Sequence, residues 1–172
     1  MAEESAQSSP SAEVDDGVPE LFQRSFPDVT FQAGRNAAGQ AILSVDRKDA
    51  ARVLRGCKED PSLGFDYLRN LCGVDLEAQG IEVVYHLLNM RTKQNVAIKT
   101  VAPADDCWVE AITPFWPGAN WHERETREMF GVEFVGHPDP RNLLLDEDMT
   151  IHPLLKAHPL ADIELFQGVD VF

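Results

Sequence analysis

The chain reads ANWHERETREMFGVEFVGHPDPRNLLLD from Ala119 to Asp146. The charged amphipathic start of this stretch predicts a helix of about three turns, roughly Trp121 to Phe130. Asn120 is predicted to cap the helix, with Glu123 reaching back to the cap, and Gly131 is predicted to end it in the left-handed conformation. A Gly-His-Pro turn and an extended apolar run follow.

The charges of this helix suggest a structural role. Glu123 and Arg127 are spaced for an ion pair one turn apart, and so are Arg124 and Glu128, which predicts a solvated, salt-bridged face. Glu123 and Glu125 are not expected to form a catalytic pair, because side chains two positions apart on a helix diverge. His122-Glu123 begins like a zinc-protease motif, but a threonine stands where the second histidine is required.

These motifs resemble the signature of the C subunit of proton-pumping NADH:quinone oxidoreductase (respiratory complex I), whose short photosynthetic counterpart is called the J subunit. The resemblance covers most of Asp46 to Pro159 and includes His152-Pro153-Leu154. Glu128 departs from it, because the family usually has an aspartate there. The matching signature positions, expected at subunit interfaces, are Trp121, Glu123, Arg124, Glu125, Phe130, Gly131, Gly136, His137, Pro138 and Arg141.

The resemblance implies a cofactor-free structural subunit of the peripheral arm. Its partners would be the quinone-reducing large subunit and the iron–sulfur subunits, held in register for electron transfer to quinone. Iron–sulfur clusters and flavin are expected in those partner subunits. The chain is expected on the cytoplasmic side of the cell membrane, with membrane contact only through integral subunits. No catalytic, cofactor-binding or metal site is expected in the chain itself.

Two alternatives remain open from the sequence. One is an accessory subunit of a membrane-bound nickel–iron hydrogenase or of a ferredoxin-driven relative. The other is a free-standing soluble enzyme that uses glutamate and histidine for acid–base chemistry.

Composition narrows the classes of partner. The chain has 172 residues, 44% of them hydrophobic, which suits one globular domain. Its formal net charge is −14 and its basic residues are scattered, so nucleic acid is excluded and a basic protein surface is the better counterpart. No stretch approaches the roughly 20 apolar residues that cross a bilayer. Cys57, Cys72 and Cys107 lack metal-binding or disulfide spacing and are expected to be free thiols.

The pattern along the chain predicts an α+β fold, a two-layer domain with a mixed, mainly antiparallel sheet packed by helices and followed by an extended C-terminal tail. Residues 1–19 are predicted to be a disordered acidic N-terminus, residues 20–146 the α+β domain that resembles this complex I family, and residues 147–172 an extended partner-binding tail. The expected helices are a short piece around Leu21–Phe26, Arg47–Cys57 capped by Asp46, and Phe65–Leu71. The expected strands are Val29–Ala33, Ala41–Val45, Ile81–Met90, Val96–Val101 and Val109–Ile112.

Three features keep two interpretations each. Arg124 and Arg141 either grip carboxylates or backbone carbonyls across a subunit boundary or are ordinary surface arginines. His137, fixed between Gly136 and Pro138, either bonds a partner or joins His152 and His158 in a metal site, which their spacing does not favour. The apolar side chains of the tail cover either the domain's own back or a neighbouring subunit.

Overall fold

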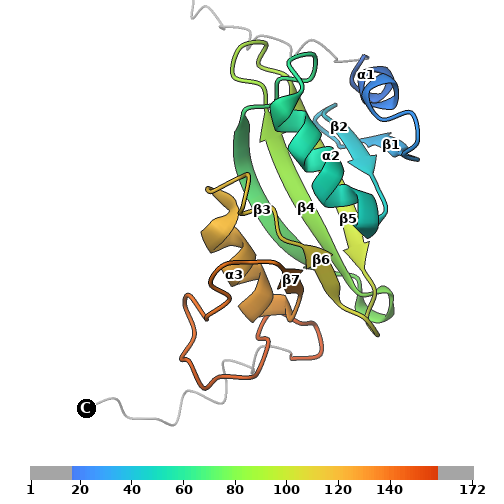
Figure 1. The fold of residues 1–172 in the computed structure, drawn as a ribbon. Helices are drawn as coiled ribbons and strands as arrows, with labels where there is room; N and C mark the ends of the chain where they lie inside the picture. Colours follow the sequence, from blue (N-terminus) through green and yellow to red (C-terminus); the bar gives the residue numbers. More distant parts are fainter. Residues whose placement is uncertain (1–16, 159–172) are drawn as a thin grey trace, which may run out of the picture.

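The computed structural model describes residues 17–158, which form a mixed sheet of five strands with helices packed against it (Figure 1). The strand order is β1-β2-β5-β4-β3. Strands β1–β2, β3–β4 and β4–β5 pair antiparallel, and only β2–β5 pair parallel. The predicted α+β fold with a mixed, mainly antiparallel sheet is confirmed.

The centre of the sheet is the hairpin of β4 (Ile81–Leu88) and β5 (Asn95–Ala102). The alternating apolar residues of β4 point to one face, as predicted, and are buried there; they are Ile81, Val83, Tyr85 and Leu87. Tyr85 lies directly opposite Ile98, which is fully buried as well. Cross-strand pairs of this kind fix the register, because a slip of one residue would turn the whole apolar set outward.

Strand β3 (Tyr67–Asp75) replaces the helix predicted over Phe65–Leu71. The register of β3 against β4 shifts between Leu68 and Asn70, so that Leu68 faces Leu87 and Leu71 faces Tyr85. This bulge places two leucines three residues apart on the same side of a strand. The prediction was wrong because that spacing is also the spacing of one helix face.

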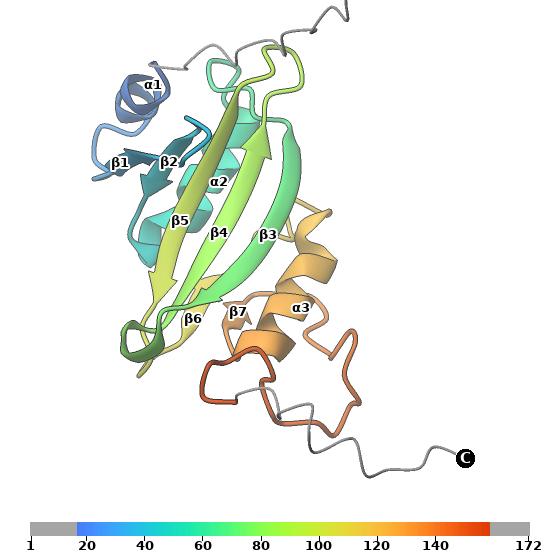
Figure 2. The ribbon, with the colours of Figure 1, turned by 180° about the vertical axis from the view of Figure 1, so that it is seen from behind.

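Helix α2 (Arg47–Glu59) packs on the inner face of the sheet. The Asp46 side chain accepts a 2.9 Å hydrogen bond from the Lys48 amide, which confirms the predicted cap. The buried face of α2 comprises Ala50, Ala51, Val53, Leu54 and Cys57. Figure 2 shows the opposite face of the sheet, which no helix covers within residues 17–158.

The N-terminal elements agree with the prediction in type and differ in boundaries. Helix α1 (Val18–Ser25) begins inside the segment assigned to the N-terminal tail, with Val18 fully buried. Strands β1 (Gln32–Arg35) and β2 (Ala41–Ser44) form the predicted hairpin, although β1 starts later than expected. The prediction for residues 1–16 lies outside the described residues.

Helix α3 (Ala119–Phe130) connects the two strands of a second sheet and packs against β3. Strands β6 (Trp108–Glu110) and β7 (Glu133–Val135) pair parallel, with α3 between them in the chain. A parallel pair needs such a crossover connection, and the helix supplies it. The two strands of this small sheet and α3 are therefore fixed against one another.

Residues 147–158 contain no helix or strand, as predicted for the start of the tail. This part returns to the domain, because the Leu154 amide donates to the Met129 carbonyl and the Lys156 amide donates to the Asp75 carboxylate. Leu155 packs against the core, whereas Leu154 is exposed. The tail positions from 159 to 172 lie outside the described residues.

Gly80 provides a test of the turn between β3 and β4. Its φ is +109°, and a Cβ atom there would overlap the Ala102 carbonyl oxygen and lie 2.7 Å from the Ala104 amide nitrogen. We expect Gly80→Ala to lower the free energy of unfolding by about 3 kcal/mol or more, because backbone strain and overpacking add.

Gly39→Ala is the matched control for this measurement by urea unfolding. Its φ is +79° and nothing lies within 4 Å of a Cβ atom there. The cost should be only the left-handed penalty of about 1 kcal/mol. Equal losses for both variants would contradict the steric account.

Candidate functional site

Helix α3 begins differently from the prediction. Gly118 precedes the helix and no side chain caps it, so Asn120 and Glu123 do not form the predicted capping box. Instead the Asn120 carbonyl oxygen lies 3.3 Å from Nε2 of His137. The end agrees with the prediction, because Gly131 is left-handed at φ 77° and its amide donates to the Arg127 carbonyl.

Glu123 lies on the buried side of α3 and is fully covered, whereas a solvated face was predicted. Its Oε1 accepts from the Ile112 amide at 2.6 Å and from the Thr113 amide at 3.3 Å, and its Oε2 accepts from the Thr113 hydroxyl at 2.6 Å. Burial raises the pKa of this carboxyl group, and these hydrogen bonds oppose the rise. The predicted ion pair with Arg127 is therefore wrong; the carboxylate joins α3 to the segment after β6.

Glu128 is the second buried carboxylate of α3. It accepts hydrogen bonds from the amides of Leu143, Leu144 and Leu145, the shortest of them 2.8 Å. The predicted ion pair with Arg124 is absent from the ion pairs of residues 17–158. Sequence spacing could not show these partners, because they are backbone groups 15 to 17 residues away.

Arg124 grips backbone carbonyls, as one of its two interpretations proposed, but within its own chain. Its Nε donates to the Arg141 carbonyl and its Nη2 to the Asn142 carbonyl, both at 2.8 Å. The guanidinium is largely covered, and Asp139 lies 3.9 Å away. Arg124 and Glu128 thus hold consecutive carbonyl and amide groups of the same segment.

Arg141 is a surface arginine with 71% of its side chain exposed. It makes two hydrogen bonds to the Asp139 carboxylate, at 2.7 and 2.9 Å. These bonds lower the pKa of Asp139 to about 2. The pair is local, two residues apart, and leaves the outer side of the guanidinium open.

His137 has a nearly covered imidazole with a defined tautomer. The Asp139 amide donates to Nδ1 at 3.0 Å, so Nδ1 is an acceptor and the proton lies on Nε2. Nε2 then donates to the Asn120 carbonyl and lies 3.6 Å from Oε2 of Glu123. Burial lowers the pKa of His137, which keeps the ring neutral.

Some of the remaining predicted site residues lie at the surface, and others pack against neighbouring backbone. Trp121 has 68% of its area exposed and Glu125 is exposed too, so Glu123 and Glu125 do diverge. The Phe130 ring covers Gly73, where a Cβ atom would lie 2.7 Å from it. Gly136, at φ 86°, and Pro138 flank His137 in the turn after β7.

His152 is a site residue that helix-face reasoning did not assign. Its Nδ1 donates to the Glu128 carbonyl at 2.8 Å, and its ring lies against Gly131. Helical spacing gave no signal for this contact; only the His-Pro-Leu motif singled the residue out.

Residues 17–158 contain no cluster of three or more side chains suited to hold a metal ion. The three cysteines are free, and burial raises the pKa of each thiol. Burial thus disfavours the thiolate form in which a cysteine binds iron or zinc. None of the described helices has the length and apolar character to cross a membrane.

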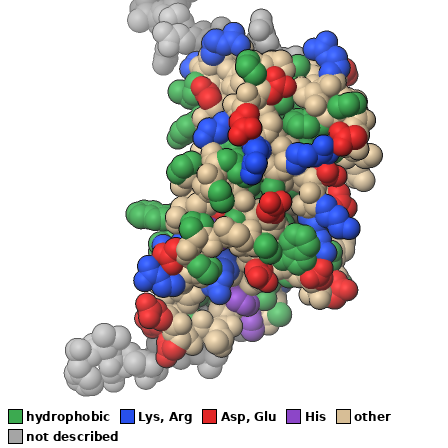
Figure 3. Space-filling model, in the orientation of Figure 1, with side chains coloured by type: hydrophobic (Ala, Val, Ile, Leu, Met, Phe, Trp, Pro, Cys, Tyr) green, Lys and Arg blue, Asp and Glu red, His purple; other side chains and the backbone are tan. Residues whose placement is uncertain are grey.

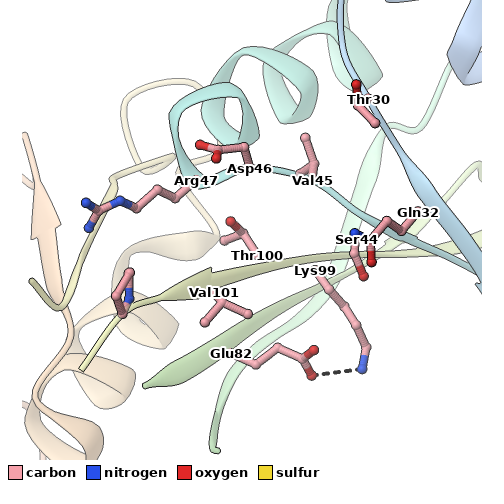
Figure 4. A pocket seen from close by; sticks show the side chains of 11 residues that line it. Thr30, Gln32, Ser44, Val45, Asp46, Arg47, Glu82, Lys99, Thr100 and Val101 are labelled. Carbon is pink, nitrogen blue, oxygen red and sulfur yellow. Dashed lines mark hydrogen bonds and ion pairs between the residues drawn. The ribbon is translucent and has the colours of Figure 1, made fainter. Parts of the chain in front are cut away.

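A polar hollow of about 420 Å³ lies away from α3, on the uncovered side of the sheet (Figure 4). Glu82 and Lys99 lie in it and are bonded to each other at 2.8 Å. None of the predicted site residues lines it. Figure 3 shows acidic and basic side chains interspersed on the face of the molecule that carries α2 and α3.

The chain is similar in sequence to known proteins. The sequence model of the family described as "Respiratory-chain NADH dehydrogenase, 30 Kd subunit" matches residues 43–164. The C subunit of the NADH-quinone oxidoreductase of Roseiflexus sp. (strain RS-1) is 44% identical over 150 residues, which cover 86% of this chain and 86% of that protein.

Two solved structures share the fold. The trypsin-resistant fragment of Nqo5 has a TM-score of 0.62 at 22% identity and covers 71% of this chain and 98% of its own. A chain of the membrane-bound sulfane sulfur reductase, an archaeal respiratory membrane complex, has a TM-score of 0.74 at 23% identity and covers 93% of this chain and 95% of its own. At these identities the likeness concerns the fold alone.

Removal of the Glu128 carboxylate should loosen the segment that it holds. We expect Glu128→Ala to lower the free energy of unfolding by about 2–3 kcal/mol, because charge-assisted hydrogen bonds to three amides are lost. Hydrogen exchange at Leu143, Leu144 and Leu145 should accelerate. Glu125→Ala, at an exposed position of the same helix, should change the free energy of unfolding by no more than about 0.5 kcal/mol. Unchanged hydrogen exchange in Glu128→Ala would show that the Glu128 carboxylate does not hold this segment.

The lowered pKa of His137 predicts an acid-sensitive contribution to stability. An unfolded chain protonates this ring near its ordinary pKa of 6.5, before the folded chain does. The contribution is therefore complete above pH 6.5 and is lost as the pH falls through the lower folded-state value. Glu123, with a raised pKa, acts in the opposite sense.

The test compares urea unfolding of the parent chain and His137→Asn between about pH 8 and pH 5.5. An asparagine oxygen can still accept from the Asp139 amide, but it does not titrate. We expect the stability difference between the two chains to shrink as the pH falls below 6.5. A constant difference would show that His137 does not titrate as described.

Proposed function

The chain belongs to the family of the 30 kDa subunit of the respiratory-chain NADH dehydrogenase and is a subunit of an NADH-quinone oxidoreductase of this type; we propose that within it the chain is a cofactor-free structural subunit of the peripheral arm. Its proposed role is to hold the quinone-reducing large subunit and the iron–sulfur subunits in register. Flavin and iron–sulfur clusters would belong to those partners.

The observation that carries this proposal is the use of the signature residues inside the chain. Glu123 and Glu128 accept bonds from backbone amides, and Arg124 donates to backbone carbonyls. A catalytic group must be able to reach a substrate and exchange protons with it. Groups saturated by backbone partners instead hold a surface in one shape, which suits a scaffold.

The cysteines also support a scaffold without its own redox centre. Cys57 is fully buried in the core, and burial raises the pKa of its thiol. Cys72 and Cys107 are half-buried, and their thiol pKa values are raised for the same reason. Such protonated thiols are poor ligands for iron, which binds thiolate.

A rigid support matters because quinone reduction requires the reacting groups of other subunits to be held in fixed geometry. A displacement of about an ångström can lower the rate of a preorganised reaction by two orders of magnitude. The proposed site of action is the cytoplasmic side of the cell membrane, reached through integral subunits. A change in this chain would then lower turnover without altering a cofactor.

The proposal is tested by purifying the tagged full-length chain from its native membranes in mild detergent. Co-purifying subunits are identified by mass spectrometry, and iron and nickel are assayed. We expect iron–sulfur subunits, a quinone-reducing large subunit and integral pump subunits, with iron and without nickel.

Two other results would overturn this function. Nickel with a large subunit that carries the cysteine ligands of a nickel–iron centre would indicate an accessory subunit of a hydrogenase. A monomer that turns over a small molecule alone would indicate a free-standing acid–base enzyme.

A further inference from the structure

The segment after β7 forms a loop whose two ends meet at one turn of α3. The Glu128 carboxylate holds the amides of residues 143–145, and the Glu128 carbonyl accepts from His152. The Leu154 amide donates to the neighbouring Met129 carbonyl at 3.1 Å. We name residues 143–154 the anchored loop; Figures 1 and 2 show it at the end of α3, away from the large sheet.

The interior of the anchored loop is ordered by its own hydrogen bonds. Asn142 donates from its side-chain amide to the Asp146 carbonyl at 2.9 Å, and the Met149 amide donates to the same carbonyl at 3.0 Å. The loop therefore has a defined shape although it contains no helix or strand. Less conformational entropy is lost on binding when a surface is already ordered.

Large apolar side chains of the anchored loop face outward. The exposed fraction is 64% for Leu144, 56% for Ile151 and 55% for Leu154, and Met149 is exposed as well. Single exposed apolar residues are ordinary on protein surfaces. Four within eleven residues, on a segment held in place at both ends, are typical of an interaction site.

Three consecutive carboxylates lie on the same loop, at Asp146, Glu147 and Asp148, and all three are exposed. Among the ion pairs formed within residues 17–158 none involves them. The basic side chains nearest in the chain are already paired, Arg141 with Asp139 and Lys156 with Glu77, although Arg141 also attracts Glu147 at longer range. Acidic side chains are visible at the lower left of Figure 3, where Figure 1 places this segment.

We propose that the anchored loop is a docking surface for a basic protein surface on another subunit of the complex. Leu144, Ile151 and Leu154 would enter an apolar depression of that subunit, and its lysines or arginines would face the three carboxylates. This inference rests on the proposed scaffold function and adds a specific surface to it. An apolar centre with a charged rim is the usual anatomy of a protein interface.

Charge selects this occupant over two others. A bilayer surface rich in anionic lipids repels three carboxylates. A second copy of the chain would bring the same carboxylates together, and like charges across an interface are unfavourable. A basic protein surface gains from both the apolar and the charged part of the loop.

The test uses the full-length chain in its complex and measures the fraction recovered with partner subunits. In the first variant, Leu144→Ser, Ile151→Ser and Leu154→Ser are combined; its control combines Tyr67→Ser, Val74→Ser and Met90→Ser at similarly exposed positions. We expect about a tenfold loss of recovery in the first variant and little change in the control. Thermal unfolding of the isolated chains should be alike.

A second pair of variants tests the charges. Asp146→Asn, Glu147→Gln and Asp148→Asn should weaken recovery and remove most of its dependence on salt. Asp105→Asn, Glu110→Gln and Glu133→Gln remove the same charge at other exposed positions and should leave the salt dependence unchanged.

Several results would overturn the inference. Recovery of the loop variants at the parent level would do so while leaving the scaffold function intact. Equal losses in the variants and their controls, binding of the loop to phosphatidylglycerol vesicles, or a homodimer that the serine variant abolishes would each overturn it too. If the parent chain recovers no respiratory subunits, the proposed function fails and this inference fails with it.

Discussion

Two buried carboxylates on one helix hold α3 and the irregular segments around it together. Glu123 fastens α3 to the segment after β6, and Glu128 fastens it to the segment after β7. A buried carboxylate is stable only when hydrogen bonds replace its hydration, and here backbone amides supply those bonds. Each segment in turn needs the carboxylate, because its amides have no strand or helix partner. Helix and irregular chain are therefore interdependent.

The sequence predicted the elements whose signal is local. Asp46 caps α2 by bonding an amide two residues away, and the alternation of Ile81, Val83 and Tyr85 directly describes a strand with one buried face. Strand β3 was missed because its bulge gives Leu68 and Leu71 helical spacing. Periodicity cannot show a bulge, which depends on the partner strand.

The contacts of the predicted site residues differ from those expected from the sequence. Ion pairing one turn apart was expected for Glu123 and Glu128, since a helix places such partners next to each other. Their real partners are amides ten or more residues away, which no spacing rule within a helix can reveal. His152 was singled out only by its motif, because its contact with α3 exists only in the folded chain.

The closed ends of the anchored loop have a consequence for how this surface can change. The bonds that attach the loop to α3 are made at its two ends, at Glu128 and Met129. Lengthening a loop that is already closed costs only about 0.6 kcal/mol for each doubling of its length. The tip can therefore gain, lose or exchange residues over generations while α3 keeps its place. The proposed docking surface could then diverge together with its partner, while the position of α3 beneath it stays the same.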